Sequence, residues 1–96
     1  MKYKIKRTDH KKLTQGLLRF CMMIPSYYYD AGSREECLTL MGLIKGEFRK
    51  TTFLRRNNWE PLESAYVLRH EDERVNIYSN ADKLYITFEI VEVEGK

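Results

Sequence analysis

The segment KLYITFEIVEV, residues 83–93, decides how this chain folds. Its apolar and polar residues alternate with the period of two that a half-buried β-strand shows. One face of the predicted strand carries Leu84, Ile86, Phe88 and Ile90, and the other carries Tyr85, Thr87 and Glu89. The segment therefore predicts an element of a sheet that has one buried face.

Further strands are predicted on either side of the helical part of the chain. Residues 65–70 and 74–78 form two of them, and the loops at residues 70–73 and 79–82 are short enough to make both connections β-hairpins. Near the start, Tyr3 and Ile5 alternate with lysines and predict another strand. Lysines on its open face suit a sheet edge, because their charges oppose pairing with a second chain.

Two helices are predicted between the first strand and the other three. Thr8 or Asp9 is expected to cap the first helix, which ends before Pro25 because proline disfavours the helical conformation of the residue preceding it. Its apolar stripe comprises Leu13, Leu17, Phe20, Cys21 and Ile24. Ser33 and Glu36 have the spacing of a capping box, which starts the second helix. Its stripe comprises Cys37, Leu40, Met41, Ile44 and Phe48.

The end of the second helix is harder to place. Gly42 and Gly46 lie inside it, where a missing side chain lets another backbone come close or lets the helix bend. Thr51 and Thr52 weaken the helix, and the polar residues and Pro61 after them indicate irregular structure.

The order of elements predicts the fold class. Strand, helix, helix and then three strands (β-α-α-β-β-β) favours an α+β fold, in which an antiparallel sheet carries two helices packed on one face. At 96 residues, the chain fits a single domain, residues 1–96.

Composition excludes several classes of protein. Hydrophobic residues make up 43% of the chain and charged residues 32%, which is typical of a folded globular domain. No apolar run approaches the roughly 20 residues that span a bilayer, and the start of the chain lacks the apolar core of a secretory signal. With only two cysteines, we expect a protein of the reducing cytoplasm that makes no membrane contact.

Charge is distributed unevenly along the chain. Residues 1–60 hold 13 Lys and Arg against 6 Asp and Glu, whereas residues 61–96 hold 4 against 8. The net charges of the two parts are therefore +7 and −4. A basic half suits phosphate or an acidic protein surface, provided that folding keeps the halves apart.

A basic and aromatic cluster lies at residues 49–59. Its cations could neutralise phosphates, its rings could stack on bases and its asparagines could contact base edges. The candidate nucleic-acid-binding residues are Arg49, Lys50, Arg55, Arg56 and Trp59. The alternative is a solvated helix end followed by a tryptophan buried under the sheet. No known nucleic-acid-binding motif separates the two.

Tyr27, Tyr28 and Tyr29 stand consecutively in the connection between the helices, so they cannot all face one core. An exposed tyrosine offers a large, stiff contact surface at low entropic cost, which makes it a frequent anchor of protein interfaces. The alternative is that two of the rings close over the crossing of the helices. The candidate partner-binding residues are Tyr27, Tyr28, Tyr29, Arg55, Arg56 and Trp59.

No spacing in the chain indicates a catalytic, metal or cofactor site. His10 and His70 lack a second ligand at the spacing of zinc sites, and Cys21 and Cys37 fall on the apolar stripes. The acidic run at residues 71–73 departs from the calcium-loop pattern. We therefore expect no metal, no cofactor and no catalytic residues.

Three short motifs resemble the C-terminal strands of RelE/ParE-type toxins. They are Tyr66-x-Leu68-Arg69, Arg74-Val75 and Lys83-Leu84-Tyr85-Ile86, which belong to about a third of the chain. The resemblance implies the same β-α-α-β-β-β order and a ribonuclease in which Arg69 and Arg74 hold RNA phosphate. The chain departs from that pattern at Lys96, where it has no aromatic or histidine tail.

Taken together, these features predict a small non-catalytic binding protein, an inhibitor or adaptor that docks on a larger protein. A nucleic-acid-handling protein is one class of target, and a phage or mobile element is one class of source. Direct nucleic-acid binding through residues 49–59 is the second hypothesis, and the RelE/ParE-like ribonuclease is the third. Open sheet edges also allow a homodimer.

Overall fold

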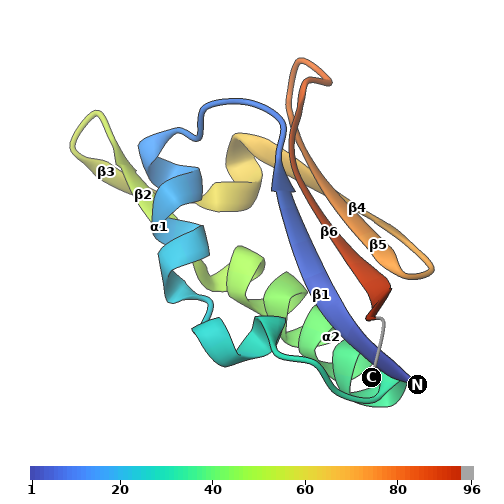
Figure 1. The fold of residues 1–96 in the computed structure, drawn as a ribbon. Helices are drawn as coiled ribbons and strands as arrows, with labels where there is room; N and C mark the ends of the chain where they lie inside the picture. Colours follow the sequence, from blue (N-terminus) through green and yellow to red (C-terminus); the bar gives the residue numbers. More distant parts are fainter. Residues whose placement is uncertain (94–96) are drawn as a thin grey trace.

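The computed structural model describes residues 1–93 and confirms the predicted α+β fold. Four strands form an antiparallel sheet in the order β1-β6-β5-β4, and the two helices pack on one face of it (Figure 1). These strands are β1 (Lys2–Asp9), β4 (Tyr66–Glu71), β5 (Arg74–Ser79) and β6 (Leu84–Val93). The helices are α1 (Gln15–Met23) and α2 (Arg34–Lys50). The single 3-10 turn η1 (Ser26–Tyr29) follows α1, and the single 3-10 turn η2 (Leu62–Ser64) precedes β4.

Two of the sequence predictions reach residues 94–96. They are the end of the single domain and the departure from the toxin pattern at Lys96, and both lie outside the described residues.

The core lies between the helices and the sheet. Phe20 of α1 contacts Phe48 of α2 and Phe88 of β6 edge to face, with ring centroids 5.6 and 6.0 Å apart. All three rings are buried, together with Ile5 of β1 and Ile77 of β5. One aromatic cluster therefore joins both helices to the sheet.

The start of α2 is as predicted. The Glu36 amide donates to the Ser33 hydroxyl at 3.1 Å, and the Glu36 carboxylate accepts from the Ser33 amide at 3.5 Å. The predicted start of α1 is wrong, because Thr8 and Asp9 belong to β1 and the cap is Thr14. The Thr14 hydroxyl is hydrogen-bonded to the Tyr66 hydroxyl, so it does not cap the helix amides.

The predicted faces of β6 are wrong at their first residues. A β-bulge pairs Tyr78 with Leu84 although Ile77 pairs with Ile86, so Tyr85 is an extra residue. Tyr85 consequently packs against the core and meets the Tyr66 ring edge to face. Beyond the bulge, the predicted apolar face holds, and Ile86, Phe88 and Ile90 are buried. Thr87 of the other face, which was predicted to be open, is buried as well.

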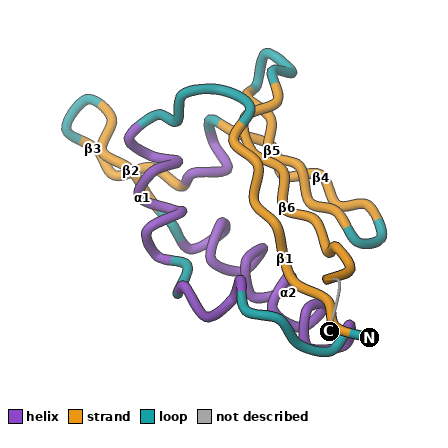
Figure 2. Tube along the Cα trace, in the orientation of Figure 1, coloured by secondary structure: helices purple, strands orange, loops and turns teal. Residues whose placement is uncertain are grey.

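The sequence indicated irregular structure in residues 52–61, and this prediction is wrong. They form a second, two-stranded antiparallel sheet from β2 (Thr52–Arg55) and β3 (Asn58–Pro61). This hairpin projects beside α1, away from the four-stranded sheet (Figures 1 and 2). β-branched and aromatic residues in β2 and β3 suit this geometry better than the helix that precedes them.

No other element of the described chain lies close to Gly42 or Gly46, so the close backbone approach that the sequence suggested is absent at these two positions. A Cβ atom added at either position would meet no other atom within 4 Å, whereas one at Gly16 would lie 3.2 Å from Leu62 and 3.3 Å from Phe53. The glycine that a close approach requires is therefore Gly16 of α1.

Alanine substitutions should separate these roles. Because alanine favours the helix, Gly42→Ala and Gly46→Ala should each raise the free energy of unfolding by about 0.5–1 kcal/mol. Gly16→Ala should lower it, because Phe53 and Leu62 must shift to admit the methyl group. Urea denaturation measures all three, and stabilisation by Gly16→Ala would contradict this packing.

Candidate functional site

The hairpin β2–β3 has a base anchored in the core. Thr51 and Leu62, which flank it, are both buried, and the Leu62 amide donates to the Thr51 carbonyl at 2.8 Å. The Thr51 hydroxyl donates to the Glu47 carbonyl at the end of α2 at 2.7 Å. Phe53 packs against the core next to Gly16. The protein therefore holds this hairpin in one position relative to α1.

The tip of the hairpin is a two-residue turn. Arg56 and Asn57 have φ of 50° and 72°, and positive φ at both central residues defines a type I′ turn. Such turns favour Asn-Gly, so the Arg-Asn pair gives only a weak sequence signal.

Apolar side chains are exposed on the hairpin. Leu54 and Trp59 lie opposite each other in β2 and β3, and they are 59% and 57% exposed. The Arg19 guanidinium of α1 lies over the Trp59 ring, 4.9 Å from its centroid. A pocket of about 170 Å³ separates the hairpin from α1 at these residues. We call Leu54, Trp59 and Arg19 the hairpin surface.

The exposed side of α1 continues this apolar character. Leu18 and Met22 lie one helical turn apart and are 47% and 83% exposed. Met22 follows Arg19 by three residues and so shares a helix face with it. The side of α1 that faces away from the core therefore carries apolar side chains beside Arg19.

Two of the predicted basic residues adjoin the hairpin surface: Arg55 and Arg56 lie at the tip and are exposed. Arg49 and Lys50 are exposed in the last turn of α2, where Arg49 lies beside Val67 and Leu68 of β4. Arg55 lies 3.8 Å from the Glu60 carboxylate, an exposed pair that contributes little to stability. Trp59 is not buried under the sheet, which was the alternative for this segment.

The three tyrosines lie on η1, at the other end of α1 from the hairpin. Tyr27 is 60% exposed, whereas Tyr28 and Tyr29 are half-buried and pack against the core. The Tyr29 hydroxyl is buried without a hydrogen-bond partner in the described residues, and this burial raises its pKa. Tyr27 is therefore the most exposed of the three, and its ring meets the Tyr28 ring edge to face, with centroids 5.0 Å apart.

Arg69 and Arg74 lie on the face of the sheet opposite the helices. Each is neutralised by a carboxylate at 3.2 Å, Arg69 by Asp82 and Arg74 by Glu89. His10 also lies there, with its Nε2 atom 2.8 Å from the Thr87 hydroxyl. The two arginines occupy neighbouring strands, as the toxin resemblance implies, but both already have anionic partners.

The remaining candidates take no part in a site. Cys21 and Cys37 are buried and unbonded to each other, and burial raises the pKa of both thiols. Within residues 1–93, no three His, Cys, Asp or Glu side chains gather so that they could hold a metal ion. No helix in the same range is long and apolar enough to cross a membrane.

Folding mixes the two charged halves of the sequence. Strand β1 pairs with β6, which places Lys6 opposite Glu89. At the sheet edges, Tyr3 of β1 is bonded to Gly32 through both backbone groups, whereas most of β4 is exposed. The homodimer through a sheet edge stays a prediction, and β4 is the edge open to it.

Comparisons with protein-family models, curated proteins and solved structures found no match for this chain.

The sequence analysis missed Leu54, Arg19, Leu18 and Met22. A signal for the last two was present, because they are long side chains on the side of α1 opposite the predicted stripe. Leu54 had no signal of its own, since its exposure follows from the hairpin.

Two glycine substitutions test the hairpin turn. Asn57→Gly places the preferred residue at a positive φ and should raise the free energy of unfolding by up to about 1 kcal/mol. Asn58→Gly, the matched control in β3, should lower it by about 0.5–1 kcal/mol, because glycine weakens a strand. Urea denaturation distinguishes them, and equal destabilisation by both would contradict the type I′ turn.

Proposed function

We propose that this protein binds another protein through the hairpin surface and acts as a small, non-catalytic inhibitor or adaptor. The observation that carries the proposal is the exposure of Leu54 and Trp59 on a hairpin whose base is anchored in the core. An exposed apolar pair costs hydration free energy in the isolated protein, and a partner that covers it recovers that cost.

The residue types of this surface are those of protein interfaces. The few residues that supply most of the binding free energy of an interface are enriched in tryptophan, tyrosine and arginine. Here Arg19 stacks on Trp59. Because the anchored base already orders the hairpin, little conformational entropy is lost on binding.

The surrounding charges indicate the chemistry of the partner. Arg56 lies in the turn next to the apolar pair, and Arg55 lies on the opposite face of the ribbon beside Glu60. Their forked guanidinium groups suit carboxylates. We therefore expect a partner surface with an apolar centre and an acidic rim, such as the acidic face of a protein that handles nucleic acid.

Capture from a lysate of the source cells tests the proposal. The wild-type protein should retain about thirtyfold more of a partner protein than the Leu54→Ala/Trp59→Ala double variant does. This factor is the effect of truncating a dominant interface residue. Quantitative mass spectrometry of the retained proteins measures the ratio. Both side chains are more than half exposed, so the variant should keep its stability.

Val67→Ala is the matched control. Val67 is 39% exposed on β4, and its truncation removes exposed apolar area outside the hairpin surface. Equal retention of every captured protein by wild type and double variant would overturn the proposal, and so would an equal loss with Val67→Ala.

Direct nucleic-acid binding is the second candidate. The observation that favours it is the hairpin itself, which gathers two arginines, Asn58 and Trp59 in one exposed ribbon. A cationic ribbon with an exposed ring can contact phosphates and stack on unpaired bases.

Fluorescence anisotropy with labelled single-stranded RNA and duplex DNA separates this candidate from the first. Nucleic-acid binding predicts affinity that falls steeply between low and near-physiological salt, and that Arg55→Ala/Arg56→Ala reduces. Binding of a protein partner alone predicts no affinity for either probe. RNA that is cut, and no longer cut after Arg69→Ala or Arg74→Ala, would favour the ribonuclease instead.

A further inference from the structure

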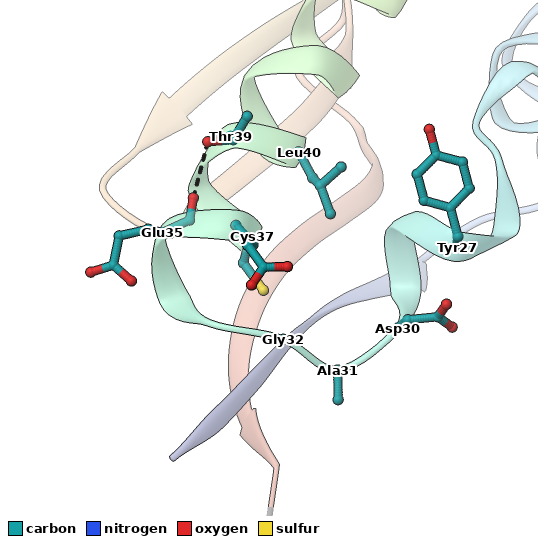
Figure 3. A pocket seen from close by; sticks show the side chains of 9 residues that line it. Tyr27, Asp30, Ala31, Gly32, Glu35, Cys37, Thr39 and Leu40 are labelled. Carbon is teal, nitrogen blue, oxygen red and sulfur yellow. Dashed lines mark hydrogen bonds between the residues drawn. The ribbon is translucent and has the colours of Figure 1, made fainter.

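A groove with apolar walls lies between η1 and the first turns of α2. Its volume is about 500 Å³. Tyr27 and Leu40 face each other across it, and the segment through Ala31 and Gly32 forms its floor (Figure 3). We call it the η1–α2 groove.

The groove is held open by backbone contacts. Gly32 and Tyr3 exchange two hydrogen bonds of 2.8 Å, which fix the floor to β1. The Asp30 amide donates to the Tyr27 carbonyl at 3.1 Å, and the Ser33 capping box fixes the start of α2. A ligand would therefore meet a site that is already formed.

The charge lining the groove is negative. Asp30, Glu35 and Glu36 border the groove, although the Glu35 carboxylate points away from Tyr27 and Leu40 (Figure 3). None of the three forms an ion pair with another residue of the described chain. Arg34, the nearest cation in sequence, is bonded to Glu73 instead. The positive end of the α2 dipole is offset by the Glu36 carboxylate in its first turn.

We infer that the η1–α2 groove binds an arginine-bearing segment of a partner protein. The alkyl part of an arginine side chain fits between Tyr27 and Leu40, where its guanidinium can stack on the phenol ring. The Glu36 carboxylate can then pair with the charge, and the Asp30 carboxylate, which lies at the outer end of the groove below Tyr27, can meet a guanidinium that extends past the ring (Figure 3). This site goes beyond the proposed function, because its charge is opposite to that of the residues around the hairpin surface.

Titration of the 15N-labelled full chain with the acetylated peptide amide Gly-Arg-Leu-Arg-Gly tests the inference by NMR. The amide signals of residues 27–40 should shift and saturate. The same peptide with citrulline in place of arginine keeps the shape and removes the charge, so it should cause no saturating shift. Free arginine amide shows whether the side chain alone is recognised, and should bind more weakly.

Charge-neutral variants locate the site. Asp30→Asn/Glu36→Gln should weaken the peptide by about fivefold, the effect of two exposed ion pairs. Glutamine also completes a capping box, so α2 should remain intact. Glu35→Gln removes the same unit charge, but the Glu35 carboxylate points away from Tyr27 and Leu40, so affinity should change less than about twofold (Figure 3).

Three results would overturn the inference: equal binding of the citrulline peptide, shifts centred on the acidic residues 71–73, or an equal loss of affinity with Glu35→Gln. The Leu54→Ala/Trp59→Ala variant should bind the peptide like wild type. A failure at the groove therefore leaves the hairpin surface untouched, and a failure of partner capture leaves the groove untouched.

Discussion

The edge-to-face contacts of Phe20 with Phe48 and Phe88 are the interaction on which the rest of the structure depends. These contacts join α1 to α2 and to β6 inside a core where all three rings are buried. Gly16 lies one turn before Phe20 on the same helix. Because it has no side chain, Phe53 and Leu62 pack close to the helix there. The position of α1 therefore sets the position of the hairpin that leans on it.

This arrangement explains how exposed apolar residues can serve binding without loss of stability. Thr51, Phe53 and Leu62 anchor the hairpin, while Leu54 and Trp59 contribute little to the fold because they face solvent. Anchoring and the proposed binding thus fall on different residues of one twelve-residue segment, residues 51–62.

Two surfaces of opposite charge follow from the same fold. The hairpin surface contacts the first turn of α1, and the η1–α2 groove is built on the segment that leaves its last turn. Arginines border the first, and unpaired carboxylates line the second. This difference in charge is the reason that the proposed partners of the two surfaces differ.

The sequence by itself determined the elements whose apolar pattern is long and regular: α2 with its Ser33–Glu36 capping box, β1, and the three C-terminal strands. These elements can be recognised in the sequence because their apolar residues recur at a short, regular spacing. That spacing is visible without knowing which residues pack against them in the fold. Only the tertiary structure decided the hairpin β2–β3, the bulge that turns Tyr85 into the core, and the exposure of Trp59 and Leu54. These features depend on which residues meet from distant parts of the chain. A four-residue strand with an Arg-Asn turn carries too little local signal to be recognised before Gly16 of α1 packs against it.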